Sequence, residues 1–430
     1  MPARGRRYLP QVAARATLQA AQPCELGIES VRIGAAAEAG EALERVLERV
    51  LERARAPLGG ARPDLGLLWL TSHHAPAAAW ALERVRAASG VRTLLGCSAE
   101  GVIGGEHELE RRPAVALWLA SLPGAAVRPL RLAPAELQAL AARGEEPGAE
   151  AAWAAALGMA SSAAEDRPAA LLVLGEPFTL DAEALLEGLH RYLPGVPLLG
   201  GMASGGYGPG ANILLLDGEV YTDGLVGVAL GGALRVQAVI SQGCRPLGRP
   251  LVVTRAEGNV IRALAGRPPL EQLRRLVQEL PEREQRLLRR GLFIGRVIDE
   301  RKHAFGRGDF LVRNVIGIDP DSGAMAVAEP MRAGITVQFH VRDADSADED
   351  LRQLLAPQAA DPPRGVVLFS CNGRGTRMYR APDHDLRVIR ELLGAVPVAG
   401  LFCAGELGPI GGRNFIHGYT ASLALFRSPP

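Results

Sequence analysis

The stretch that decides the fold is VVLFSCNGRGTRMYRAPDHDLRVIRELLGAVPVAG, residues 366–400. It opens on the apolar run 366–369, passes through a polar loop into a helical pattern at 383–393, and ends on a second apolar run that stops at Gly400. Short apolar runs bounded by glycine predict buried strands, and Asp383 before the helical pattern is typical of an N-cap. Two strands joined by a helix lie parallel through a right-handed crossover. The stretch therefore predicts one strand–helix–strand unit.

The same pattern occurs twice more, nearer the N-terminus. Each copy has an apolar strand, a helix, a glycine and a second strand that runs into glycine, and one further apolar strand follows it. This order predicts an α/β (α+β mixed) fold, in which repeated strand–helix–strand units form mixed sheets flanked by helices. The expected strands are 67–70, 91–95 and 114–117 in the first copy, 171–174, 196–200 and 226–230 in the second, and 366–369, 396–400 and 421–425 in the third. The expected helices are 76–88, 181–193, with Asp181 as its N-cap, and 383–393.

The segment between the second and third copies has a different pattern. Apolar runs at 251–254 and 259–262 flank Glu257-Gly258, which predicts a β-hairpin. A helix is expected from Pro268-Pro269 onward. Further strands are expected at 292–298, 310–318, 324–329 and 335–342. We therefore expect an antiparallel, hairpin-rich second half. The chain divides into a basic disordered tail (1–26), an N-terminal domain (27–235) and a C-terminal domain (236–430).

The composition excludes several classes of function. The net charge of +1 gives no strong field to attract nucleic acid or an anionic membrane. Lys302 is the single lysine and follows no glycine-rich loop, so a P-loop is excluded, and no G-x-G-x-x-G motif occurs. Five widely spaced cysteines without a CxxC pair favour reduced thiols, and no apolar run reaches the ~18 residues of a membrane span. We expect a cytoplasmic protein with no cofactor and no nucleic-acid or membrane partner.

Polar loops leave both strands of the third copy at one edge of the predicted sheet. Ligands bind beyond the carboxyl ends of parallel strands, and these loops are long and rich in glycine, which permits close backbone approach. An arginine here can grip a carboxylate, and Glu406 can accept an ammonium group, so the loops suit a zwitterion such as an amino acid. The alternative is that arginine and glutamate pair with each other and brace the loops. The candidate ligand-binding residues are Cys371, Asn372, Arg374, Arg377, Cys403, Glu406, Arg413, Asn414 and His417.

Four further residues are secondary candidates. Glu100 and Ser204 hold places in the first and second copies similar to that of Glu406. Cys97 follows a strand as a nucleophile does in an elbow turn, but G-x-S-x-G does not fit, and a buried structural cysteine is the alternative. His384 lies between two aspartates, either as a base or as part of a helix cap. No cysteine and histidine spacing matches a standard metal site, so neither catalytic nor metal-binding residues are assigned.

Several motifs resemble FIST domains. The run LGCSAEGVIGG at 95–105 resembles the N-terminal FIST domain. The runs GCRPLG (243–248), QFHVRD (338–343), FSCNGRG (369–375) and AGELGP (404–409) resemble the C-terminal FIST domain. The resemblance spans residues 27–426 and implies a sensory module of signal transduction that binds small ligands such as amino acids. It implies no catalytic residues.

FIST domains are also found joined to kinase, cyclase or chemotaxis output domains, or to an F-box. The sequence outside the resemblance leaves no room for such a domain, so we expect the output to come from a separate signalling protein. The expected function is an intracellular ligand sensor rather than an enzyme. Two alternatives stay open: a cysteine-dependent hydrolase or transferase that uses Cys371 or Cys97, and a structural interaction scaffold.

Overall fold

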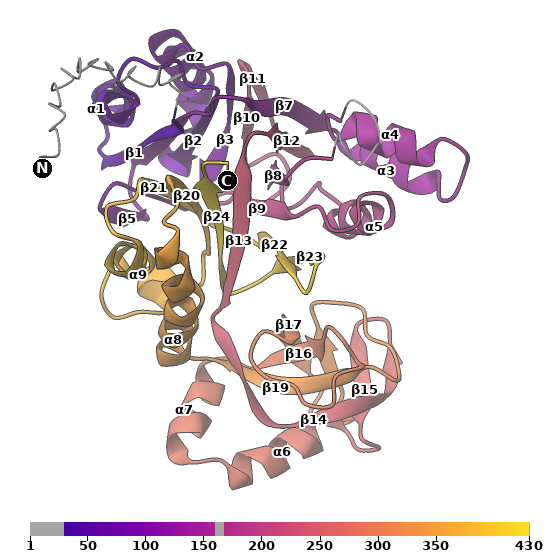
Figure 1. Ribbon diagram of the computed structural model, residues 1–430. Coiled ribbons are helices and arrows are strands. Elements are labelled where there is room, and N and C mark those ends of the chain that lie inside the picture. Colours follow the sequence, from indigo (N-terminus) through magenta and orange to yellow (C-terminus); the bar gives the residue numbers. More distant parts are fainter. Residues whose placement is uncertain (1–29, 160–166, 430) are drawn as a thin grey trace, which may run out of the picture.

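The computed structural model describes residues 30–159 and 167–429. Within these residues the chain forms three six-stranded sheets and one closed six-stranded barrel. The sheets and the helices that cover them make up a body, and the barrel lies beside it with helices of its own (Figure 1). The mixed α/β class predicted from the sequence is confirmed.

The body consists of three units with the same order of elements: strand, helix (two helices in unit 2), strand, helix, strand, β-hairpin and final strand. Unit 1 comprises β1 (Arg32–Ala39), α1 (Leu43–Arg55), β2 (Leu65–Thr71), α2 (Ala78–Ser89), β3 (Thr93–Ala99), β4 (Gly101–Gly104), β5 (His107–Glu110) and β6 (Ala114–Ser121). Unit 2 comprises β7 (Ala125–Leu132), α3 (Pro134–Ala142), α4 (Ala149–Ala156), β8 (Ala170–Gly175), α5 (Ala182–Tyr192), β9 (Leu198–Met202), β10 (Leu214–Leu216), β11 (Glu219–Tyr221) and β12 (Leu225–Gly232). Unit 3 comprises β13 (Arg235–Gln242), α8 (Ala344–Leu355), β20 (Gly365–Cys371), α9 (His384–Leu393), β21 (Val398–Cys403), β22 (Glu406–Ile410), β23 (Arg413–His417) and β24 (Thr420–Arg427).

Each predicted strand–helix–strand copy forms a parallel pair. The pairs are β2 with β3, β8 with β9, and β20 with β21. The second strand of each pair carries a glycine at the same place: Gly96, Gly200 and Gly400. A Cβ atom on any of these glycines would lie 1.8 Å from a carbonyl oxygen of the neighbouring strand. Any side chain there would force the parallel strands apart, so this glycine is a physical requirement of the repeat.

The hairpin of each unit does not stay in the sheet of its own unit. The hairpin β4–β5 of unit 1 extends the sheet of unit 3 beside β21, and β10–β11 of unit 2 extends the sheet of unit 1 beside β3. The hairpin β22–β23 of unit 3 extends the sheet of unit 2 beside β9. The three units therefore exchange hairpins in a cycle, and strands from both sides of residue 236 share two of the sheets.

One apolar core lies at the centre of the body, where the inner faces of the three sheets meet. Trp69 and Trp118 come from unit 1, Leu172 from unit 2, and Phe369 and Phe426 from unit 3. The rings of Trp118 and Phe426 pack with their centroids 4.8 Å apart. The outer faces are covered by α1 and α2, by α3 to α5, and by α8 and α9, which stand around the body in Figure 1. Since fully burying one large apolar side chain contributes about 1.5–3 kcal/mol, this shared core holds the units together.

The barrel is inserted into unit 3 between β13 and α8. It comprises β14 (Cys244–Glu257), β15 (Val260–Leu264), β16 (Phe293–Val297), β17 (Phe310–Ile318), β18 (Met325–Val327) and β19 (Thr336–Arg342), with α6 (Pro269–Glu279) and α7 (Glu282–Arg290) outside it. The predicted hairpin, the helix after Pro268 and the four later strands are confirmed. The chain enters and leaves the barrel side by side, because the Asp343 backbone N–H donates to the Gly243 carbonyl oxygen at 3.3 Å.

The two predicted helix caps have different outcomes. Asp181 accepts the backbone N–H of Ala184 at 3.0 Å and caps α5 as expected. Asp383 stands at the N-cap position of α9 with a φ of 61°, but its side chain does not cap the helix. It accepts the backbone N–H of Glu108 at 2.6 Å instead, so the cap prediction is wrong. The exchanged hairpin β4–β5 competes for this carboxylate. Among the described residues, no helix has the length and apolar character needed to cross a membrane.

Candidate functional site

A pocket of about 570 Å³ opens between the strand ends of unit 3 and the barrel. The loops after β20 and β21 form one wall, and the turn between β23 and β24 forms a second. The third wall comes from the barrel, through β17 and the end of β19. The register of the sheet places the two loops together, since Cys371 and Cys403 are direct partners on the parallel strands β20 and β21. Five of the predicted ligand-binding residues line this pocket: Cys371, Asn372, Arg377, Cys403 and His417.

Cys371 and Glu406 form a coupled pair at the inner end of this pocket. Cys371 lines the pocket and is partly exposed, whereas Glu406 lies fully buried behind it, in contact with the Cys371 thiol. Burial raises the pKa of Glu406 to about 8. Burial also raises the pKa of the Cys371 thiol, and the neighbouring Glu406 raises it further. At neutral pH the resting pair is therefore a thiol beside a largely protonated carboxyl group.

Arg374 does not face the pocket. Its side chain is 0% exposed and forks onto Asp385 of α9, with Nε and Nη2 each donating at 2.8 Å. Nη2 also donates to the hydroxyl of Tyr379 at 2.8 Å. Burial alone would raise the pKa of Asp385, but the Arg374 guanidinium outweighs it and holds that pKa well below its usual range. Arg374 thus braces the loop after β20 through Asp385 rather than through a glutamate, and the expectation that it grips a ligand is corrected.

His384 belongs to the same bracing network. Its ring stacks on Tyr379 with centroids 3.4 Å apart, and its two nitrogens lie 3.0 Å from Asp385 and 2.9 Å from Asp348. Both nitrogens are therefore occupied by carboxylates, and the ring is buried away from the pocket. The interpretation of His384 as a poised base is replaced by a structural role at the start of α9.

Residues from all three units meet at the edge of the pocket. Arg377 forms a two-pronged ion pair with Glu100 of unit 1 and donates to the Asn372 carbonyl oxygen at 2.8 Å. Ser204 of unit 2 is buried; its hydroxyl accepts from the Glu100 backbone N–H at 2.8 Å and donates to the Phe402 carbonyl oxygen at 2.6 Å. Glu100 and Ser204, secondary candidates for the ligand site, thus link the units beside the pocket.

The remaining candidates lie elsewhere. Asn414 is buried in the hairpin β22–β23, where its side chain bonds the backbone of Leu198 and Val196 at 2.8 Å each. Arg413, at the exposed tip of the same hairpin, lies near His190. Cys97 is fully buried in the central core, and burial raises its pKa strongly, so it cannot meet a substrate. These three residues are removed from the candidate site for lack of access to the pocket.

The barrel contributes pocket residues that the sequence analysis did not select. Arg342 at the end of β19 donates to the Gly373 carbonyl oxygen at 3.2 Å and lies over the ring of Tyr419, 5.4 Å from its centroid. It forms no ion pair with any acidic side chain that the structure describes. Arg313 of β17 also lines the pocket but is paired with Glu329. Arg342 lies within the QFHVRD run, which signalled a family resemblance but gave no reason to place it against unit 3.

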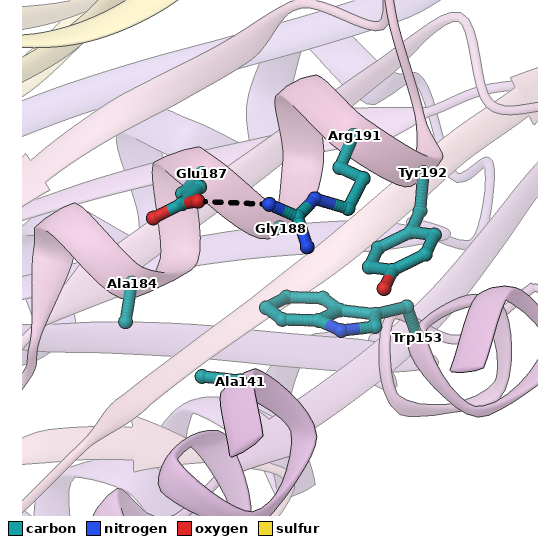
Figure 2. Close-up of a pocket in the computed structure, with 7 residues that line it drawn as sticks. All are labelled: Ala141, Trp153, Ala184, Glu187, Gly188, Arg191 and Tyr192. Atoms are coloured by element: carbon teal, nitrogen blue, oxygen red, sulfur yellow. Dashed lines mark hydrogen bonds and ion pairs between the residues drawn. The ribbon is translucent and has the colours of Figure 1, made fainter. Parts of the chain in front are cut away.

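A second, smaller depression of about 90 Å³ lies between α3, α4 and α5. Figure 2 shows Trp153 and Tyr192 stacked there, with Arg191 above the indole and paired to Glu187 at 3.0 Å. Its size is close to that of a few water molecules, and its one charged pair is satisfied internally. It offers little to a ligand. Among residues 30–159 and 167–429, no three His, Cys, Asp or Glu side chains converge in a way that could hold a metal ion.

Comparison with known proteins places this architecture in a family. Residues 64–267 match the FIST N domain and residues 269–409 match the FIST C domain. The uncharacterized protein Rv0628c of Mycobacterium tuberculosis is 43% identical over 401 residues, covering 92% of this chain and 100% of its own. The uncharacterized protein Mb0898c of Mycobacterium bovis is 42% identical over 379 residues, covering 87% and 93%.

Among solved structures, a cyanuric acid hydrolase from A. caulinodans aligns over 93% of this chain and 100% of its own. The identity is 10% and the TM-score 0.34, too low for a shared fold to be inferred. The two consecutive domain matches, which together span residues 64–409, show that this chain belongs to the FIST domain family.

Proposed function

We propose that this protein is a sensory protein that binds a small polar ligand, such as an amino acid, in the pocket between unit 3 and the barrel. One observation carries the proposal: the pocket combines a guanidinium without an acidic partner and an amide oxygen without a donor. Arg342 supplies the first, and the buried Oδ1 of Asn372 supplies the second, as far as the described chain extends. A ligand with one carboxylate and one ammonium group satisfies both.

The free energy of binding favours a ligand that pairs with both the Arg342 guanidinium and the Asn372 oxygen. A buried oxygen that accepts no hydrogen bond costs about 1–3 kcal/mol, which a ligand N–H group recovers. A guanidinium that is already held in place loses little entropy when a carboxylate binds it. Arg313 and Arg377, the other arginines of the pocket, are neutralised by Glu329 and Glu100. The charge available to a ligand anion therefore centres on Arg342.

The position of the pocket supports a role in signalling. The barrel is joined to the body by two neighbouring crossings, at Gly243 and Asp343, and the ligand lies between the two parts. A ligand that touches both parts favours one relative position of the barrel over others. The proposal includes a separate signalling protein that recognises this position of the barrel. Ligand-induced hinge movements between two parts of a chain are a common way to change such a position.

The test is a binding panel on the full chain. Free amino acids should raise the melting temperature, while amines without a carboxylate and carboxylates without an amino group should do so less. At a ligand concentration of 100 times Kd the stabilisation is about 2.7 kcal/mol. Titration calorimetry on Arg342→Ala should show a Kd weaker by about 30-fold or more. Arg413→Ala removes an exposed arginine outside the pocket and should bind as the wild type does. If no amino acid binds, or if Arg342→Ala binds normally, the proposal fails and the scaffold alternative gains weight.

A further inference from the structure

Cys371 has the surroundings of a reactive sulfur. It is the thiol at the carboxyl end of β20, it lines the pocket, and its Sγ accepts the backbone N–H of Gly373 at 3.4 Å. The backbone N–H of Tyr419 also points to this sulfur. Two N–H groups aimed at one sulfur stabilise negative charge that develops on it. Burial keeps the resting group a neutral thiol, so its activation needs a base.

Glu406 is the base that the site provides. Its Oε2 accepts the backbone N–H of Thr420 at 3.1 Å, while its Oε1 accepts no hydrogen bond from any residue that the structure describes. The carboxyl group is fully buried and interacts with the Cys371 thiol. A proton-accepting oxygen with a free lone pair beside a thiol is the arrangement that general-base activation of a nucleophile requires.

The backbone around the sulfur is held in a strained conformation. Tyr419 has a φ of 60°, in the left-handed region that a residue with a side chain seldom adopts. Its ring packs against Gly373 so closely that a Cβ on that glycine would lie 2.6 Å from a ring carbon. Strain of this kind persists where the surroundings enforce it, and it often accompanies a functional group. Here the strained residue is the one whose backbone N–H lowers the pKa of the neighbouring Cys371 thiol.

We propose that Cys371 is a nucleophile that accepts the acyl group of a small activated carboxylic acid derivative, an ester or thioester, bound in the pocket. In its ionised form, which becomes populated as the pH approaches 8, Glu406 removes the thiol proton as the sulfur attacks the carbonyl carbon. An S–C bond forms, and the carbonyl electrons move onto oxygen, where the unpaired N–H groups of Arg342 can stabilise them. When the oxyanion collapses, the bond to the leaving alcohol or thiol breaks, and Glu406 returns the proton to it. The product is a thioester on Cys371.

This inference uses the same pocket as the proposed sensor but adds a chemical step that reversible binding does not need. Cys403, the register partner of Cys371, has no comparable environment: its Sγ is fully buried, and its one polar contact is the Leu401 carbonyl oxygen at 3.9 Å. The assignment therefore falls on Cys371 rather than on thiols in general.

The test uses p-nitrophenyl acetate as an activated ester and the full chain. Wild type should release p-nitrophenolate in a burst of one equivalent and gain one acetyl group on the peptide that contains Cys371. Cys371→Ser should abolish the burst. Glu406→Gln keeps the shape of the side chain but not the base, and should slow acylation about 100-fold. Cys97→Ala removes a core thiol outside the pocket and should leave the burst unchanged.

Several results overturn the inference. These are acetylation at another residue, acylation of Glu406→Gln at the wild-type rate, or a wild-type rate no greater than that of free N-acetylcysteine. Circular dichroism on each variant separates lost chemistry from lost folding. Amino-acid binding to Cys371→Ser separates the two proposals. Binding without acylation of the wild type sinks this inference alone, whereas acylation without binding sinks the sensor alone.

Discussion

Units 2 and 3 each bury a glutamate at the carboxyl end of their parallel strands, and the two carboxylates have opposite surroundings. Glu176, directly after β8, accepts hydrogen bonds from the Phe178 N–H and the Thr179 hydroxyl at 2.9 Å each and from Asn212 at 3.1 Å. Glu406, in unit 3, accepts one from Thr420 and leaves an oxygen unpaired within the described chain. Both side chains are 0% exposed. The same topology thus buries a carboxylate whose two oxygens both accept hydrogen bonds in unit 2, and a carboxylate with one unpaired oxygen in unit 3.

The difference follows from the barrel. In unit 2 the strand ends are covered by the unit's own two loops, which supply Thr179 after β8 and Asn212 after β9 as partners. In unit 3 the barrel is inserted after β13 and stands off from the strand ends, which leaves a pocket in place of a covering loop. Saturated buried groups are the rule in proteins, and the unsaturated oxygens of Asn372 and Glu406 lie at the rim where we propose the ligand site.

The comparison assumes that the units form one body, and the largest effect should come from dividing it. Residues 27–235 expressed alone should not fold, because β4–β5 lose their partner β21 and β9 loses β22. Apolar edges exposed in this way favour aggregation. Size-exclusion chromatography and circular dichroism of the two halves, 27–235 and 236–430, provide the measurement. Two soluble halves with separate cooperative melting transitions would contradict the cyclic exchange of hairpins.

Removing the barrel instead should spare the body. Gly243 and Asp343 are hydrogen-bonded neighbours, so a short glycine linker can replace residues 244–342. The shortened chain should keep a cooperative melting transition, because the shared core contains no barrel residue. It should lose amino-acid binding, since Arg342 and one wall of the pocket are gone. Binding at wild-type affinity would show that the pocket does not need the barrel.

The next largest effect should come from breaking the buried ion pair between Arg374 and Asp385 in unit 3. Asp385→Asn leaves the Arg374 guanidinium buried without its counter-charge, and breaking such a pair costs about 3–5 kcal/mol. Arg377→Ala breaks the partly exposed pair with Glu100 in the same loop and should cost no more than about 1 kcal/mol. Denaturant titrations of the two variants test this order. Equal losses of unfolding free energy in the two variants would mean that burial of an ion pair does not determine how much stability its loss costs.

The last effect is a pH dependence of stability at Glu406. Its pKa in the folded chain is about 8, above the value of about 4.5 of an unfolded glutamate, so the native state retains a proton that the unfolded state releases. Stability from this group is full below pH 4.5 and falls as the pH rises toward 8, at about 1.4 kcal/mol per pKa unit of difference. Glu406→Gln should therefore gain stability over wild type between pH 5 and pH 8, by a few kcal/mol at most. Melting curves across this range would refute the prediction if the difference stayed constant.

Much of the body could be predicted from the sequence, because its signals are local. Apolar runs, helix patterns and the glycines at 96, 200 and 400 recur in each unit, and they fix the parallel pairs. The meeting of Cys371 and Cys403 followed from that topology. The partners of the charged side chains did not follow. Asp385 had the pattern of a helix-start residue, and only the fold shows that it takes Arg374 away from the pocket.

The place of Arg342 in the pocket could not be predicted from the sequence for a different reason. It lies 31 residues before Gly373 in the chain, on a barrel whose placement against unit 3 leaves no local signal in the sequence. The exchange of hairpins is likewise not predictable from the sequence. The apolar pattern of each hairpin would fit the sheet edge of its own unit as well as the edge that it pairs with. What sequence patterns cannot express is which of several compatible edges the folded chain selects.

The exchange of hairpins also has a consequence for synthesis on the ribosome. The sheet of unit 1 needs β10–β11 from unit 2, and the sheet of unit 2 needs β22–β23, which lie near the end of the chain. Domains usually fold in order as they emerge. Here the sheet of unit 1 keeps an open edge until β10–β11 emerge, and the sheet of unit 2 keeps one until β22–β23 have left the exit tunnel. The open edges of unit 2 therefore persist for much of translation, and we expect the yield of folded protein to depend on chaperones that cover them.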